Sequence, residues 1–166
     1  MPARVEHLSV FLCPPFQLQI ILELFILNGL TPICPYCGNF SSKVTGKEIY
    51  PHRPDLFHKA FYQCAPCDAY VGCHPGTDKP LGRLADAELR RWKSIAHAAF
   101  DPIWKARFER KRQVDQKYRK HHARGGRYKR LAELLGIPSK ECHIGIFDVT
   151  LCKRVYTLCK SGALED

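Results

Sequence analysis

Hydrophobic positions change their spacing along the chain, and the change predicts where strands give way to helices. Residues 31–77 contain short apolar runs between turn-forming Pro and Gly, as is typical of short strands. Three strands are predicted, at 48–50, 59–63 and 69–73. From residue 84 onward, apolar side chains recur at the spacing of one helix face. This order predicts an α+β fold, in which a small sheet precedes a compact helical region.

The helical region, residues 78–166, is predicted to hold about four helices. Asp101-Pro102 is a helix-start signal, because Asp caps a helix and Pro is tolerated at its first position. A first helix is therefore predicted before this pair. A second, basic helix within 102–130 is predicted to end before Gly125-Gly126. The apolar stripe of the first helix comprises Ala85, Leu89, Trp92, Ala96 and Ala99.

Two shorter helices are predicted after the glycine pair. The first spans about 127–135 and ends at Gly136, a residue type that commonly terminates helices in the left-handed conformation. Asp148 is placed to cap the second. The inner face of this last helix is predicted to consist of Val149, Cys152, Val155, Tyr156 and Cys159.

Residues 1–30 form an apolar N-terminal extension. Its run 16–27 (FQLQIILELFIL) is interrupted by two Gln and one Glu, whereas a membrane span needs about 20 predominantly apolar residues. No small-x-small cleavage site follows. We therefore expect a short helix that ends at Asn28-Gly29 and packs on the rest of the protein or on a partner. A membrane anchor is not expected.

Two C-x-x-C pairs give the strongest chemical signal: Cys34 with Cys37, and Cys64 with Cys67. Each pair lets two thiolates in one tight turn reach the same ion, and two such turns complete a tetrahedral site. A glycine follows the first pair, whereas Asp68 stands at the matching position after the second. The pattern predicts one structural zinc ion in a small ribbon. Four protein ligands would leave no position for a substrate.

Other chemistry is also compatible with these residue types. The cysteine pairs could form disulfides or a redox site, but a redox pair precedes a helix in a βαβ unit, and strands are predicted here. Cys-His dipeptides at 73–74 and 142–143 leave open a second metal or catalytic site, with packing in the core as the alternative. A metal-dependent nuclease or hydrolase would use His74, His97, His143 and Asp148 as ligands or acid–base groups.

Positive charge is concentrated in one stretch. The net charge is +10, and residues 105–130 hold twelve of the 26 basic residues but only two of the 16 acidic ones. The rest of the chain is therefore neutral. A localised basic block is typical of proteins with a polyanionic partner, usually nucleic acid, although a solvated helix face is the alternative. The predicted phosphate contacts are Lys105, Arg107, Arg110, Lys111, Arg112, Lys117, Arg119, Lys120, Arg124, Arg127, Lys129 and Arg130.

Aromatic and histidine side chains interleave with the basic block. Rings can stack on exposed bases while Lys and Arg neutralise phosphates. No helix-turn-helix or RNA-recognition signature is visible, so we expect backbone binding with little sequence preference. The interleaved side chains are Phe108, Tyr118, His121, His122 and Tyr128.

Several segments, including both cysteine pairs, combine into a recognisable pattern. They are 34–38, 48–50, 64–77, 80–90, Trp92, 96–97, 100–102, 134–137, 143–145, 147–148 and Cys152. With them the chain resembles, over roughly 33–158, a family of small phage and prophage proteins described as a zinc-finger-containing domain of unknown function. The resemblance implies zinc at the four cysteines and a phage or bacterial cytosolic setting. It supplies no activity, and the stretch 105–127 is longer and more basic than the family's usual connection.

Three functions are compatible with the sequence. We favour a cytoplasmic, non-enzymatic accessory protein in which the ribbon is held by zinc and the basic block meets nucleic acid. The first alternative is a protein-interaction module that acts on a host factor through the apolar extension and the ribbon surface. The second is the metal-dependent nuclease or hydrolase, which requires its four candidate side chains to converge.

Overall fold

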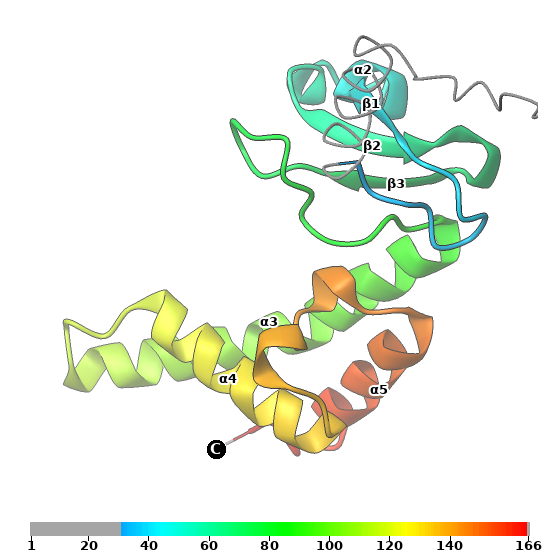
Figure 1. Ribbon diagram of the computed structural model, residues 1–166. Helices are drawn as coiled ribbons and strands as arrows, with labels where there is room; N and C mark the ends of the chain where they lie inside the picture. The colour runs from blue at the N-terminus through cyan, green and yellow to red at the C-terminus, as the bar shows by residue number, and fades with distance from the viewer. Residues whose placement is uncertain (1–30, 166) are drawn as a thin grey trace, which may run out of the picture.

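The computed structural model describes residues 31–165 and shows a small antiparallel sheet stacked on a helical region (Figure 1). This arrangement confirms the predicted α+β fold. The helix predicted in the N-terminal extension lies outside the described residues. Within the described part, no helix is both long and apolar enough to cross a membrane.

In chain order the elements are β1 (Ser42–Thr45), α2 (Gly46–Ile49), η1 (Pro54–Leu56), β2 (Ala60–Cys64), η2 (Ala65–Cys67), β3 (Ala69–Gly72), α3 (Ala87–Val114), α4 (Lys120–Leu135), η3 (Ser139–Glu141), η4 (Ile144–Ile146) and α5 (Val149–Lys160), where η marks a 3-10 helix.

The sheet has β2 at its centre, with β1 and β3 paired antiparallel on either side. Strands β2 and β3 confirm two of the three predicted strands. The strand predicted at 48–50 is wrong, because Glu48 lies in α2. Thr45 and Glu48 form a capping box there: the Thr45 backbone N–H donates to the Glu48 carboxylate over 2.9 Å, and the Thr45 hydroxyl accepts from Lys47 N–H. The third strand is β1 instead, in which Val44 alone is apolar.

The first predicted helix and the start of the second form one helix, α3, which ends at Val114, whereas residues 120–124 of the predicted second helix belong to α4. Helix α3 continues through Asp101-Pro102, so the predicted helix start is wrong. An interior proline costs a helix about 3 kcal/mol, and burial of Leu89 and Phe100 on the same helix offsets this cost. Asp101 does not cap a helix; its carboxylate accepts a hydrogen bond from Trp104 Nε1 over 2.9 Å.

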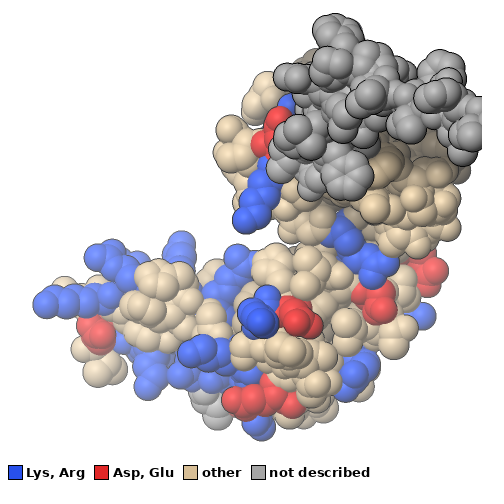
Figure 2. All heavy atoms as spheres, viewed as in Figure 1, with Lys and Arg blue, Asp and Glu red and all other residues tan. Residues whose placement is uncertain are grey.

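Helices α3 and α4 form a helical hairpin that carries residues 105–130, and we call this segment the basic hairpin. α4 runs through Gly125-Gly126, so the predicted break at the glycine pair is wrong. Its predicted end is confirmed, because Gly136 is left-handed with φ 70°. Figure 2 shows Lys and Arg side chains gathered over the hairpin.

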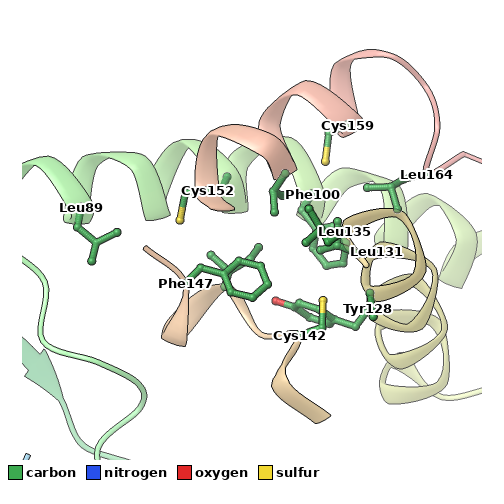
Figure 3. Close-up of a cluster of buried hydrophobic side chains, with 14 of the residues drawn as sticks. Leu89, Phe100, Tyr128, Leu131, Leu135, Cys142, Phe147, Cys152, Cys159 and Leu164 are labelled. Atoms are coloured by element: carbon green, nitrogen blue, oxygen red, sulfur yellow. The ribbon is translucent and has the colours of Figure 1, made fainter. Parts of the chain in front are cut away.

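The hydrophobic core lies where α3, α4 and α5 meet (Figure 3). Phe100 of α3, Leu131 of α4 and Val155 of α5 are fully buried there. The predicted inner face of α5 is confirmed at Cys152, Val155 and Cys159. Tyr156 is the exception, because it is exposed at the edge of the core.

The ribbon and the helical region meet at a tight joint. Lys93 Nζ donates hydrogen bonds to the carbonyls of Gly145, over 2.6 Å, and Arg83, over 3.3 Å. Burial lowers the pKa of Lys93 to about 8. A Cβ at Gly82 would lie 2.1 Å from the Gly145 carbonyl oxygen, so only glycine fits at this crossing. The joint fixes the segment before α3 against η4.

Candidate metal centre

The first cysteine pair lies in a tight turn between Ile33 and Phe40, which form an isolated β-bridge. The Gly38 N–H donates to the Cys34 carbonyl over 2.9 Å and closes the turn. Gly38 has φ +74°, a conformation that L side chains rarely adopt. The turn buries Cys34 and leaves Cys37 exposed.

The second cysteine pair lies where β2 ends and η2 begins. Cys64 ends the strand, and Cys67 ends the 3-10 turn. Asp68 follows with φ 45°, the one positive φ of a non-glycine residue in the described chain. It occupies the position that Gly38 has after the first pair, so the two turns share one backbone design. Asn and Asp tolerate this conformation better than other non-glycine residues.

The four cysteine sulfurs gather at one point. All four Sγ atoms lie within 4.8 Å of one another, and those of Cys37 and Cys64 are 3.6 Å apart. Four sulfurs held about 2.3 Å from a tetrahedral zinc ion would lie about 3.8 Å apart. The eight described cysteines form no disulfide. The cluster is therefore suited to one structural zinc ion, as the sequence predicts.

The thiols of this cluster differ in acidity. The Asn39 backbone N–H and the neighbouring Cys64 thiol stabilise the Cys37 thiolate and lower its pKa to about 7. The neighbouring Cys37 sulfur and burial both favour the protonated form of Cys67, so the pKa of Cys67 rises to about 12. Several adjacent thiolates would repel one another without a counterion. A divalent cation at the centre removes this penalty and holds the ligands deprotonated.

Contacts beyond the sulfurs tie the cluster to the rest of the protein. The buried cysteines pack with Ala69 of β3 and Leu84, which precedes α3. The Tyr36 hydroxyl, in the first cysteine turn, accepts a hydrogen bond from the Asp86 N–H over 3.1 Å. Asp86 is in turn the N-cap of α3, because its carboxylate accepts from the Leu89 N–H. The metal centre therefore supports both the sheet and the start of α3, the longest helix among the described residues.

Comparison with known protein families agrees with this geometry. A family model described as a zinc-finger-containing domain (DUF3268) matches residues 30–162. The chain belongs to this family. The matched segment includes the ribbon and the three helices α3, α4 and α5. No curated protein and no solved structure matches the chain.

A second metal site of the kind considered from the sequence is not assembled in this family member. Among residues 31–165, only the four zinc-finger cysteines bring three or more ligand side chains together. His74 lies on an exposed turn, and His97 lies 3.8 Å from Asp101 of its own helix. The Nδ1 atom of His143 accepts a backbone hydrogen bond, and Asp148 caps α5. His74 and His97 both interact electrostatically with His143, but among the described residues their ligand atoms do not meet at one point. The geometry therefore gives no support to the metal-dependent nuclease or hydrolase.

The twelve basic residues predicted to contact phosphates differ in burial: one is buried, two are half-buried and nine are exposed. Arg127 is buried and donates to the Leu164 carbonyl over 2.7 Å, so it serves the fold of this zinc-finger protein. Arg130 pairs with Glu133 on the surface of α4 over 3.1 Å. Arg107 and Arg124 are half-buried. The exposed members are Lys105, Arg110, Lys111, Arg112, Lys117, Arg119, Lys120, Lys129 and Arg130.

Proposed function

We propose that this zinc-finger protein is a non-enzymatic accessory protein that binds nucleic acid through the basic hairpin. The observation that carries the proposal is the charge of residues 105–130, a segment that contains twelve basic residues and only two acidic ones. The helical hairpin displays most of these cations on its surface (Figure 2). A structural zinc site with four protein ligands supplies no open coordination position, so binding rather than metal catalysis fits the rest of the molecule.

The arrangement of the hairpin suits a polyanion. Lys111 and Arg112 lie in the last turn of α3, and Arg119 and Lys120 lie where α4 begins. All four are exposed, and none has an acidic partner among residues 31–165. Phosphate contacts by such groups release counterions, so affinity should fall steeply with salt. A cytoplasmic setting, in a phage or its bacterial host, is part of this proposal.

A paired set of variants tests the proposal. In the test variant, Lys111, Arg112, Arg119 and Lys120 are all changed to Gln. The control removes the same charge outside the hairpin by changing the exposed residues Lys47, Lys59, Lys79 and Lys140 to Gln. Binding of a labelled oligonucleotide is followed by anisotropy between about 50 and 200 mM salt.

The test variant should bind more weakly than the wild type. The slope of its logarithmic binding constant against logarithmic salt concentration should be shallower by about 0.7–0.9 for each phosphate contact that is lost. The control should keep nearly the full slope, because its charges lie away from the contact surface. Unchanged binding by the test variant would refute the proposal. Equal weakening of both variants would show attraction by net charge without a defined surface.

A second candidate function, protein interaction, is favoured by one feature of the ribbon. Ile33 and Phe40 face each other across the first cysteine turn and are 57% and 53% exposed. Paired apolar side chains at this exposure are typical of contact surfaces. A host protein that binds the purified wild type but not an Ile33→Ser/Phe40→Ser variant would support this function, whereas equal binding to both would remove its basis.

A further inference from the structure

The tip of the basic hairpin combines aromatic rings with cations. Residues 115–119 join α3 to α4, and Asp115 orders this connection by accepting hydrogen bonds from the Tyr118 and Lys117 backbone N–H groups over 3.0 and 2.9 Å. The Tyr118 ring packs over Phe108 of α3, with centroids 6.5 Å apart and planes inclined by 24°. Phe108 is buried, whereas Tyr118 is half-buried. The Tyr118 ring also contacts the His122 ring of α4, with centroids 5.7 Å apart and planes inclined by 48°, so a base would stack on the part of the ring that these two neighbours leave uncovered.

A cavity of about 480 Å³ opens beside these rings. Phe108, Tyr118 and the Gln116 amide line it together with the cations Arg112, Arg119 and Lys120. No acidic residue of the described chain is part of its lining. The volume is within the range of small-molecule sites, about 300–1,000 Å³. The lining therefore offers a ring surface, a hydrogen-bonding amide and positive charge in one place.

Aromatic packing in this region already involves cations. The Arg112 guanidinium lies 5.6 Å from the centroid of the Phe108 ring, and Lys120 Nζ lies 5.8 Å from it on the other helix of the hairpin. The cations at the tip are thus held close to ring faces. A protein that only neutralised duplex phosphates would need no accessible ring here, because paired bases are stacked within the helix and present no free face.

We infer that the hairpin tip holds an unpaired base of single-stranded or looped nucleic acid. The base stacks on Tyr118, and the flanking phosphates contact Arg112, Arg119 and Lys120. This inference rests on the proposed function and narrows its substrate class. Stacking on an aromatic ring tolerates every base, which agrees with the absence of a sequence-reading motif.

The test removes each member of the proposed stack in turn: the base, by use of an abasic strand, and the Tyr118 ring, by substitution. Zinc-loaded full-length protein is titrated against labelled oligothymidylate of about 20 nucleotides, against a strand of equal length and charge with abasic sites, and against a duplex of the same length. Tyr118→Leu removes the aromatic ring and keeps an apolar side chain. Tyr118→Phe is the matched control, because it keeps the ring and removes only the hydroxyl.

The wild type and Tyr118→Phe should bind the thymidine strand about tenfold more tightly than the abasic strand. Tyr118→Leu should bind these two strands alike and should keep the duplex affinity of the wild type. Wild-type protein that does not distinguish the thymidine strand from the abasic one would overturn the inference, whatever the variant does. Retained discrimination by Tyr118→Leu would overturn it as well.

The failure of the proposed function would look different. In that case the wild type would bind none of the three nucleic acids at low salt. Equal, salt-dependent binding of all three would leave the proposed function standing and remove only the stacking site. Because the abasic comparison uses the wild-type protein, it decides the question even if Tyr118→Leu disturbs the hairpin.

Discussion

The guanidinium of Arg90 donates hydrogen bonds to both the backbone carbonyl of Asp68, over 2.8 Å, and its carboxylate, over 3.0 Å. It also donates to the Ala85 carbonyl and lies 4.0 Å from the centroid of the Tyr70 ring. One residue of α3 thus connects the second cysteine turn, β3 and the start of the helical region. Since Asp68 adopts a left-handed conformation where the first turn has a glycine, Arg90 supplies contacts that hold the less favourable turn.

We predict that Arg90→Met lowers the free energy of unfolding by about 2–3 kcal/mol, because two carbonyls lose their donor and Tyr70 loses its cation. Urea unfolding of the zinc-loaded protein measures the change. Arg91→Met is the matched control: Arg91 is the exposed neighbour on the same helix, and its replacement should change stability by less than about 0.5 kcal/mol. Equal effects of the two substitutions would contradict a role for Arg90 in joining the ribbon to α3.

Zinc binding gives the second prediction. The purified wild type should contain one zinc ion per chain by elemental analysis, because one four-sulfur cluster is present among residues 31–165. Cys64→Ser should lose most of this zinc, and the far-ultraviolet circular dichroism of the chain should change on metal loss, since structural zinc contributes folding free energy. Chelation of the wild-type protein should have the same effect.

Cys73→Ser is the control for zinc loss. Cys73 is half-buried near the end of β3 and lies outside the cluster, so this variant should keep its full zinc content. A stoichiometry of two, or zinc loss from Cys73→Ser, would show that the Cys-His dipeptides take part in metal binding.

The metal ligands were predictable because their signal is local. Each pair of thiolates belongs to one turn of four consecutive residues, so the ligands can be recognised from the local sequence without knowledge of the tertiary structure. The α+β order could be predicted for the same reason, from the change in hydrophobic spacing. Even the irregular turn at Asp68 was visible in the sequence, as an aspartate in the place where the first pair has a glycine.

Two predicted helix boundaries, at Pro102 and at Gly125-Gly126, were wrong because packing overrides local preference, whereas the helix end at Gly136 and the cap at Asp148 were predicted correctly. Pro102 and the pair Gly125-Gly126 are each breakers on their own, yet α3 and α4 run through them with buried side chains on both sides. The strand wrongly predicted at 48–50 could have been avoided from the sequence alone, because Thr45-x-x-Glu48 is a capping box, which indicates a helix start.

The structural role of Arg127 was also beyond the sequence. It lies among surface cations in the sequence, but its partner, the Leu164 carbonyl, comes from the end of the chain. A contact between residues this far apart leaves no local pattern. The same holds for Lys93, whose two acceptor carbonyls belong to the joint with the ribbon.

The glycine pair within α4 gives the third prediction. A Cβ added at Gly125 or Gly126 would meet nothing within 4 Å, and both residues already have helical backbone. Gly125→Ala and Gly126→Ala should each raise the free energy of unfolding by about 0.4–1 kcal/mol, because the unfolded chain loses freedom. Thermal or urea unfolding measures the gain.

Gly136→Ala is the opposite case and serves as the control. Its added methyl group also has open space, but the residue has φ +70°, so the substitution should lower stability by about 1–2 kcal/mol through backbone strain. Loss of stability at Gly125 and Gly126 as well would show that the glycines are required within α4 for a reason other than space.

The last prediction concerns alkaline pH. Cys152 is fully buried in the core, and burial raises the pKa of its thiol to about 11 from 9.0. Between pH 9 and 11 the unfolded chain releases this proton, while the folded protein retains it. The folded state therefore binds more protons in this window, so its stability falls as pH rises, by up to about 1.4 kcal/mol per pH unit.

Cys152→Ala isolates this effect, because alanine does not titrate. At pH 8 the variant should be less stable than the wild type, since it leaves a small void in the core. This deficit should shrink as the pH approaches 11, when measured by urea unfolding under reducing conditions. Lys93, with its pKa lowered to about 8, contributes in the opposite direction, because its buried neutral form gains stability as pH rises; since both proteins contain Lys93, most of that contribution cancels in the difference. A deficit that stays constant from pH 8 to 11 would mean that the Cys152 thiol ionises alike in both states, and so that this part of the core admits water.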